Sequence, residues 1–98
     1  MATYSVTTAK HATLTASTVD TVNVSNSAAF ITVINRATSG DPIYFTIGDA
    51  STTPTPVVGA DDTYVVAAGM TLILPGDSTN RQIKLISDSA QAYSVQVI

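Results

Sequence analysis

The sequence lacks several residue types on which reactive sites depend. Its 98 residues contain no cysteine, no tryptophan and no glutamate, and they contain a single histidine, His11. Without cysteine the chain cannot form a disulfide, a thiolate zinc site or a thiol nucleophile. Catalysis needs a positioned acid, base or nucleophile, and no serine lies in a G-x-S-x-G nucleophile elbow. We therefore predict that the protein is not an enzyme and has no catalytic residues.

The residues that could still bind a metal or a cofactor are sparse. His11 shares one side of an alternating run with Thr13 and Thr15, a pattern typical of a solvent-facing or edge position on a strand. Asp61–Asp62 is the only adjacent acidic pair, whereas calcium needs six or more oxygen ligands. The five glycines are isolated from one another, so none forms a loop that cradles a phosphate. The sequence predicts neither a metal site nor a cofactor site.

Charge is also scarce. Charged residues make up 11% of the chain, the net charge is −3, and the cations are Lys10, Arg36, Arg81 and Lys84. Four scattered cations cannot form the basic stripe that binds nucleic acid, and they do not favour an anionic membrane surface. The apolar stretches are a few residues long, far short of a membrane span, and Met1–His11 contains no apolar signal-peptide core. We therefore expect synthesis in the cytoplasm, without nucleic-acid or membrane partners.

Threonine, valine and isoleucine, with 16, 11 and 8 residues, dominate what is present. These β-branched side chains favour strands, and the strong helix formers are few. The β-like runs are Tyr4–Thr8, His11–Ala16, Asp20–Ser25, Phe30–Asn35, Ile43–Ile47, Thr63–Ala67, Thr71–Leu74, Arg81–Ser87 and Ala92–Ile98, with turns at Ser25–Asn26–Ser27 and Pro75–Gly76–Asp77. Short strands at this spacing predict a single all-β domain over residues 1–98, an antiparallel β-sandwich of about eight strands, Ig-like or jelly-roll-like.

Two segments yield more specific predictions. Phe30–Asn35 is apolar on both faces, which predicts a central strand covered on both sides. Ile43–Ile47 alternates cleanly, with Tyr44 and Thr46 predicted to face outward. The last two runs, Arg81–Ser87 and Ala92–Ile98, are expected to pair with each other and close the sheet.

Apolar residues exceed what a lone sandwich can hide. A sandwich needs one buried face per sheet, yet several of its runs are apolar on both faces. The remaining apolar surface must be covered by loops or by another protein molecule. We select Tyr44, Tyr64, Ile73 and Ile86 as candidate interface residues.

Parts of the chain resemble a known class of proteins. Met1–Leu14 (MATYSVTTAKHATL), Asp61–Gly69 (DDTYVVAAG), Lys84–Ser87 and Ala92–Val97 are similar to segments of small β-rich virion proteins of tailed bacteriophages that infect actinobacteria. These proteins are similar in size to head decoration, or capsid-cementing, proteins. The resemblance implies attachment to the major capsid protein on the outer surface of the virion, as a homo-oligomer for which a trimer is one form. It carries over no site residues.

The sequence is also compatible with two other functions. A carbohydrate- or cell-surface-binding module of a phage tail or fibre would need outward Tyr44 or Tyr64 in a shallow groove, because tyrosine offers sugars a flat face and a polar tip. A tail-tube or head–tail connector subunit would instead form rings or tubes in solution.

Overall fold

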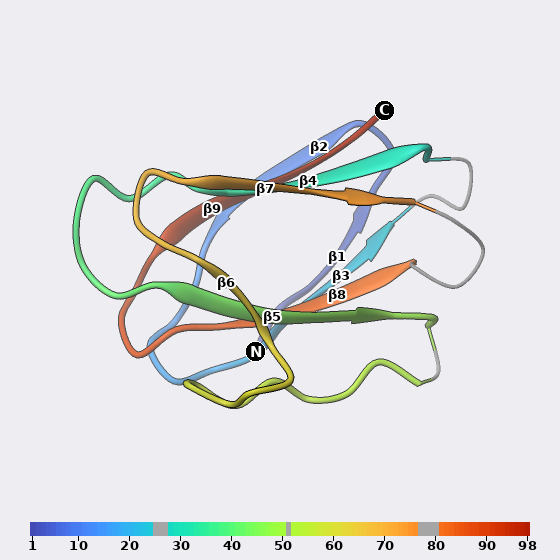
Figure 1. The fold of residues 1–98 in the computed structure, drawn as a ribbon. Helices are drawn as coiled ribbons and strands as arrows, with labels where there is room; N and C mark the ends of the chain where they lie inside the picture. The colour runs from blue at the N-terminus through green and yellow to red at the C-terminus, as the bar shows by residue number, and fades with distance from the viewer. Residues whose placement is uncertain (25–27, 51, 77–80) are drawn as a thin grey trace.

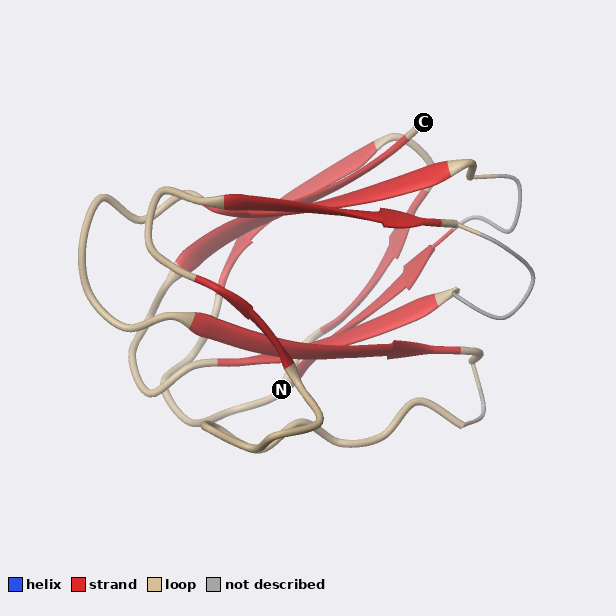
Figure 2. Cartoon of the chain, in the orientation of Figure 1, coloured by secondary structure: helices blue, strands red, loops and turns tan. Residues whose placement is uncertain are grey.

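The computed structural model describes residues 1–24, 28–50, 52–76 and 81–98, and all regular structure in these residues is β-strand (Figure 2). The strands are β1 Thr3–Val6, β2 Ala9–Thr13, β3 Asp20–Val24, β4 Phe30–Asn35, β5 Ile43–Gly48, β6 Tyr64–Val66, β7 Thr71–Pro75, β8 Gln82–Ile86 and β9 Ala92–Val97. The described ranges contain no helix that could cross a membrane. The predicted all-β class is confirmed. The predicted turn at Ser25–Asn26–Ser27, and Asp77 of the second predicted turn, lie outside the described residues.

The strands form two sheets that pack face to face (Figure 1). The five-stranded sheet has the order β1-β3-β8-β5-β6, and the four-stranded sheet has the order β2-β9-β4-β7. Without β1, these orders are those of an eight-stranded jelly roll built from two Greek keys. Of the two predicted kinds of sandwich, the strand order therefore matches the jelly roll. The prediction of antiparallel strands needs one correction, because β1 pairs with β3 in parallel.

The predicted pairing of the last two strands is wrong. β8 pairs with β3 and β5 in the five-stranded sheet, whereas β9 pairs with β2 and β4 in the other. The connection between them crosses the end of the sandwich, where the Ser87 hydroxyl donates a hydrogen bond to the carbonyl of Pro42. The turn between β6 and β7 also crosses between the sheets, and Gly69 supplies a positive φ of 76° there. Alternation in the sequence identifies strands, but it does not identify their neighbours.

The core lies between the two inner faces. Its largest fully buried side chains are Tyr93, Phe45, Leu14, Ile31, Ile43, Ile83 and Leu85. β4 is a central strand, as predicted, and its Ile31 and Val33 face this core. The expectation that β4 is covered on both sides is wrong, because Phe30, on its other face, is exposed. The four-stranded sheet therefore leaves apolar residues on its outside.

The outer face of the five-stranded sheet is covered by the chain itself. The described residues between β5 and β6, which are 49, 50 and 52–63, are called here the cover segment, and they pass below β5 in Figure 1. Thr46 points outward from β5 but is buried, and its hydroxyl donates a 2.6 Å hydrogen bond to the carbonyl of Pro54. A Cβ atom on Gly48 would lie 3.2 Å from Cα of Thr53, so the cover segment rests directly on the strand.

Candidate functional site

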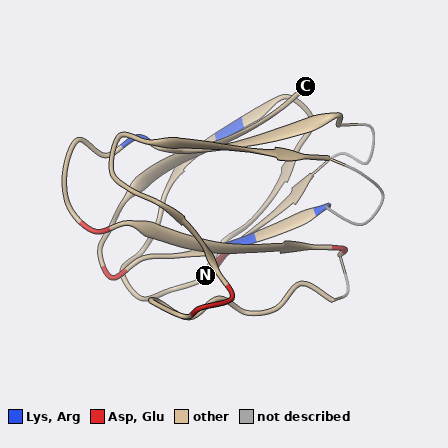
Figure 3. Ribbon diagram, in the orientation of Figure 1, with Lys and Arg blue, Asp and Glu red and all other residues tan. Residues whose placement is uncertain are grey.

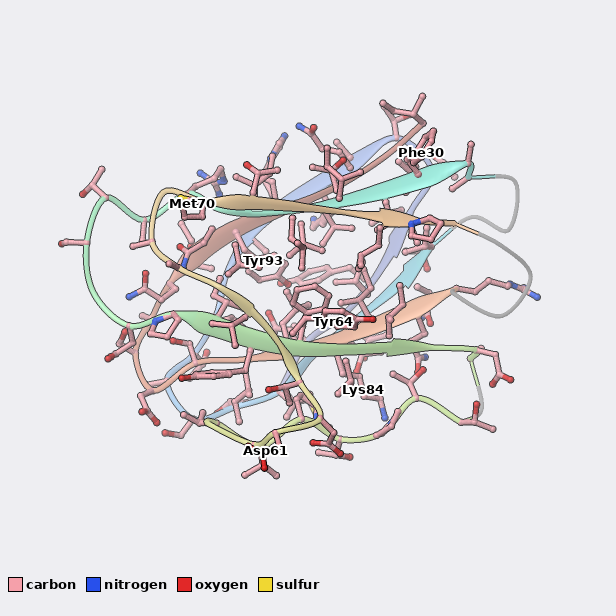
Figure 4. All side chains as sticks on the ribbon, viewed as in Figure 1. Phe30, Asp61, Tyr64, Met70, Lys84 and Tyr93 are labelled. Atoms are coloured by element: carbon pink, nitrogen blue, oxygen red, sulfur yellow. The ribbon has the colours of Figure 1, made fainter. Side chains whose placement is uncertain are left out.

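The described residues enclose no pocket. Nor do the described parts of the chain bring together three or more side chains of the types that hold metal ions. Asp61 and Asp62 are exposed in the cover segment, and Figure 4 shows Asp61 at its outer turn. Candidate functional residues must therefore be sought among individual side-chain contacts and on the outer surfaces.

One contact joins a histidine to a serine. His11 on β2 lies opposite Ser94 on β9, and its Nδ1 is 2.6 Å from Ser94 Oγ. A hydroxyl held by a histidine is the arrangement that activates a serine nucleophile. Ser94 is only 1% exposed, however, so this hydroxyl is not presented to a substrate. The contact instead ties the two strands together. Nothing local in the sequence could indicate it, because the partners are 83 positions apart.

A second polar contact lies inside the sandwich. Asp20 on β3 is buried and accepts a 2.9 Å hydrogen bond from the hydroxyl of Tyr93 on β9. Its other carboxylate oxygen accepts a 3.3 Å hydrogen bond from the backbone N–H of Ala2. Burial, followed by the hydrogen bond to Asp20 and its negative charge, raises the pKa of Tyr93 well above its ordinary value. The contact joins the two sheets and holds the entry to β1, so its role is to stabilise the fold.

The four predicted interface residues occupy three different places. Tyr44 on β5 and Ile86 on β8 are opposite each other on the outer face of the five-stranded sheet, and both are half-buried. Tyr64 lies on the edge strand β6 and is stacked on Phe45, with ring centroids 5.2 Å apart. Ile73 lies on β7, in the opposite sheet.

The two tyrosines do not form one platform. Tyr44 pairs with Val65, while Tyr64 pairs with the next residue along β5, Phe45. Because alternate residues of a strand point to opposite faces, Tyr44 and Tyr64 lie on opposite sides of the five-stranded sheet. One face of the Tyr64 ring is also occupied by Phe45. The carbohydrate-binding alternative needs outward Tyr44 or Tyr64 in a shallow groove, and this arrangement does not bring the two tyrosines together in one.

Exposed apolar side chains lie on the outer side of β9, β4 and β7, called here the bare face. Its apolar members are Phe30, Ile34, Ile73, Pro75 and Ile98, and it also carries the polar residues Thr32, Thr71, Ser94 and Gln96. Phe30 lies opposite Pro75 and Thr32 lies opposite Ile73, while Ile98 bonds to the backbone of Phe30. The exposed fractions are 52% for Phe30, 62% for Ile73 and 83% for Ile98.

The strands β9, β4 and β7 carry no charged residue, and Figure 3 shows the described cations and acids on other parts of the chain. Of the predicted interface residues, only Ile73 belongs to this surface. Phe30 was missed, although its place on the second apolar face of Phe30–Asn35 was visible in the sequence. Comparisons with protein-family models, curated proteins and solved structures give no match for this chain.

Proposed function

We propose that this protein is a structural component of a phage particle, a decoration protein that binds the outside of the head and stabilises it. The observation that carries the proposal is the bare face, where apolar side chains are exposed on strands that carry no charge and are already paired. The resemblance of several segments to phage virion proteins supports the same conclusion. The expected partner is the major capsid protein, through a flat apolar region of its outer surface.

The physical properties of the bare face suit this role. Burial of apolar surface contributes about 25 cal/mol per Å², and Phe30, Ile73 and Ile98 all have surface left to bury. Strands that are already paired lose little conformational freedom when they dock, so ordering costs little. An uncharged surface should also bind with little dependence on salt. Many copies on one shell would add their effects and resist its disassembly.

The proposal is tested by adding the purified protein to undecorated heads. We expect binding, with increased resistance of the heads to heat and osmotic shock. Phe30→Asp places a charge on the bare face between Pro75 and Ile98 and should weaken binding at least about tenfold, because that charge would be buried in the contact. The matched control is Val57→Asp, since Val57 is also exposed but belongs to the cover segment of the other sheet.

Val57→Asp should bind as the wild-type protein does. Failure of the wild-type protein to bind heads at any salt concentration would contradict the proposed function. Equal binding by the two variants would show that the bare face is not the surface used.

A further inference from the structure

The four-stranded sheet differs in charge from the rest of the described chain. Its strands β2, β9, β4 and β7 contain no acidic residue, although the net charge of the protein is −3. The acids of the described residues lie on β3 and in the connections (Figure 3). On the sheet itself, β2 carries His11 and Lys10, whose ammonium lies 4.6 Å from the ring centroid of Tyr4 on β1, and Arg36 follows directly after β4. This sheet is therefore basic, on a protein that is acidic as a whole.

Arg36 continues the bare face beyond the end of β4. Its backbone N–H donates to the carbonyl of Ala92, which extends the pairing of β4 with β9 by one residue. Alternate residues of a strand point to the same face, so the side chain of Arg36 leaves the strand on the side of Ile34, which is the outside. Arg36 is exposed there. The outer surface of this sheet thus changes from apolar at Ile34 to cationic at Arg36.

Hydrogen bonds to the backbone hold the guanidinium of Arg36 in place. Nε and Nη2 each donate to the carbonyl of Tyr93 at 3.3 Å, and Nη2 also donates to the carbonyl of Ala12 on β2 at 3.4 Å. The side chain therefore lies across β9 toward β2. In the described part of the chain its partners are all carbonyls, so its positive charge is not paired with a carboxylate. The guanidinium has further N–H donors, those of Nη1 among them, for another acceptor.

Docking through the bare face would remove water from this guanidinium. Residues 30 and 36 are about 20 Å apart along an extended strand, and a contact of about 800 Å² per partner is wide enough to cover both. A charge that loses its water without gaining a partner opposes docking. The docked surface must therefore supply an acceptor, and a carboxylate matches a guanidinium both in charge and in its paired hydrogen bonds.

We propose that Arg36 binds a carboxylate, an aspartate or glutamate side chain, on the head subunit that the bare face contacts. The inference rests on the proposed function and adds the chemistry of the partner, which has an acidic residue at the rim of its apolar contact region. Because two carbonyls already hold the guanidinium, little freedom is lost when it binds. An ion pair enclosed in the contact is screened little by salt, so binding remains only weakly salt-dependent.

Binding of Arg36 variants to undecorated heads is the first test. Arg36→Gln removes the charge and should weaken binding about tenfold, as expected for the loss of a hydrogen bond between charged groups. Arg36→Lys keeps the charge but not the planar set of donors, and should weaken binding about threefold. The matched control is Lys84→Gln, which makes the same change of charge on the outer face of the other sheet and should bind within about twofold of the wild-type protein. Urea unfolding checks that each variant is folded.

Neutralising the carboxylates of the heads is the second test. Undecorated heads are treated with a carbodiimide and glycinamide, which converts exposed carboxylates to amides. The wild-type protein should bind treated heads about tenfold more weakly than untreated heads, whereas Arg36→Gln should bind both about equally. The excess loss in the wild-type protein measures the coupling between Arg36 and a carboxylate of the partner.

Two results would overturn this inference alone. They are a folded Arg36→Gln variant that binds heads as tightly as Lys84→Gln, and an equal loss of binding by the wild-type protein and Arg36→Gln on treated heads. If Arg36→Gln does not fold, Arg36→Lys takes its place in both comparisons. Failure of the wild-type protein to bind untreated heads would overturn the proposed function and this inference with it.

Discussion

The outer faces of the two sheets both carry large apolar side chains, but these side chains differ in their exposure to water. Each carries large apolar side chains, Tyr44 and Ile86 on the five-stranded sheet and Phe30 and Ile73 on the four-stranded sheet. The cover segment rests on β5 at Thr46, next to the first pair, and this pair is half-buried, whereas the second pair is exposed to water. The comparison teaches that an apolar outward face acquires a functional meaning only where the chain does not cover it.

The inner faces do not share this difference. Both contribute to one core, and the hydrogen bond between Asp20 and Tyr93 runs from one sheet to the other. The sandwich is therefore asymmetric on the outside alone. This asymmetry gives three expectations about stability, and each uses a change on one face or in the shared interior.

The largest difference in stability should come from replacing one outward apolar residue by threonine on each of the two faces. Tyr44→Thr and Ile73→Thr each replace an outward apolar residue by a β-branched one that keeps the strand preference. Tyr44 is partly covered, so its loss should lower the free energy of unfolding by about 2 kcal/mol. Ile73 is largely exposed, so its loss should change that free energy by less than about 0.5 kcal/mol.

Urea unfolding of the two variants measures this difference. Both variants should be measured at the same low protein concentration. Equal losses of stability would mean that the cover segment does not protect the outer face of the five-stranded sheet, and the contrast between the faces would disappear.

The free energy of unfolding should decrease at alkaline pH because of Tyr93 in the core between the sheets. The folded state raises the pKa of Tyr93, so above pH of about 10 the unfolded chain releases a proton that the folded chain keeps. The unfolded state then binds fewer protons, and stability should fall with rising pH by up to about 1.4 kcal/mol per pH unit. Below the ordinary tyrosine pKa this contribution to stability is fully present. Unfolding measured in urea between pH of about 9 and 11 gives the slope.

Tyr93→Phe is the matched variant for this slope. It lacks the ionising hydroxyl, so its stability should fall less steeply above pH of about 10, whatever its stability at neutral pH. Parallel pH profiles for the two proteins would contradict the buried, proton-retaining state of Tyr93.

The smallest effect concerns the attachment of the cover segment. Thr46→Val keeps the shape of the side chain but removes the hydrogen bond to the carbonyl of Pro54. We expect a loss of about 1 kcal/mol in the free energy of unfolding. Hydrogen exchange should become faster in the cover segment but not in β4 and β7. Unchanged exchange in residues 49–63 would mean that this hydrogen bond does not hold the segment in place.

The sequence was sufficient to predict where the strands lie, but it was not sufficient to predict which strands pair. Phe30–Asn35 was predicted with its observed bounds, and Ile43 and Phe45 are buried as their alternation predicts. The pairing of Arg81–Ser87 with Ala92–Ile98 was wrong, because a connection that crosses between sheets has the same local pattern as a hairpin. Strand order depends on contacts between distant residues, which local periodicity does not encode.

The candidate surface was predicted only in part for the same reason. An excess of apolar outward residues was visible, and Ile73 is indeed exposed on the bare face. Tyr44 and Ile86 could not be separated from Ile73, because nothing in the irregular composition of residues 49–63 indicates which strand that segment covers. The hydrogen bond between Thr46 and Pro54 distinguishes the outer faces of the two sheets, but it forms only in the folded chain and leaves no local pattern in the sequence.

The strands β1 and β2 are edges of the two different sheets on one side of the sandwich, and Lys10 on β2 lies over the ring of Tyr4 on β1. A foreign strand that added to this side would have to remove water from the Lys10 ammonium, which costs free energy. The contact of Lys10 with Tyr4 therefore protects this side of the molecule against aggregation through its strand edges.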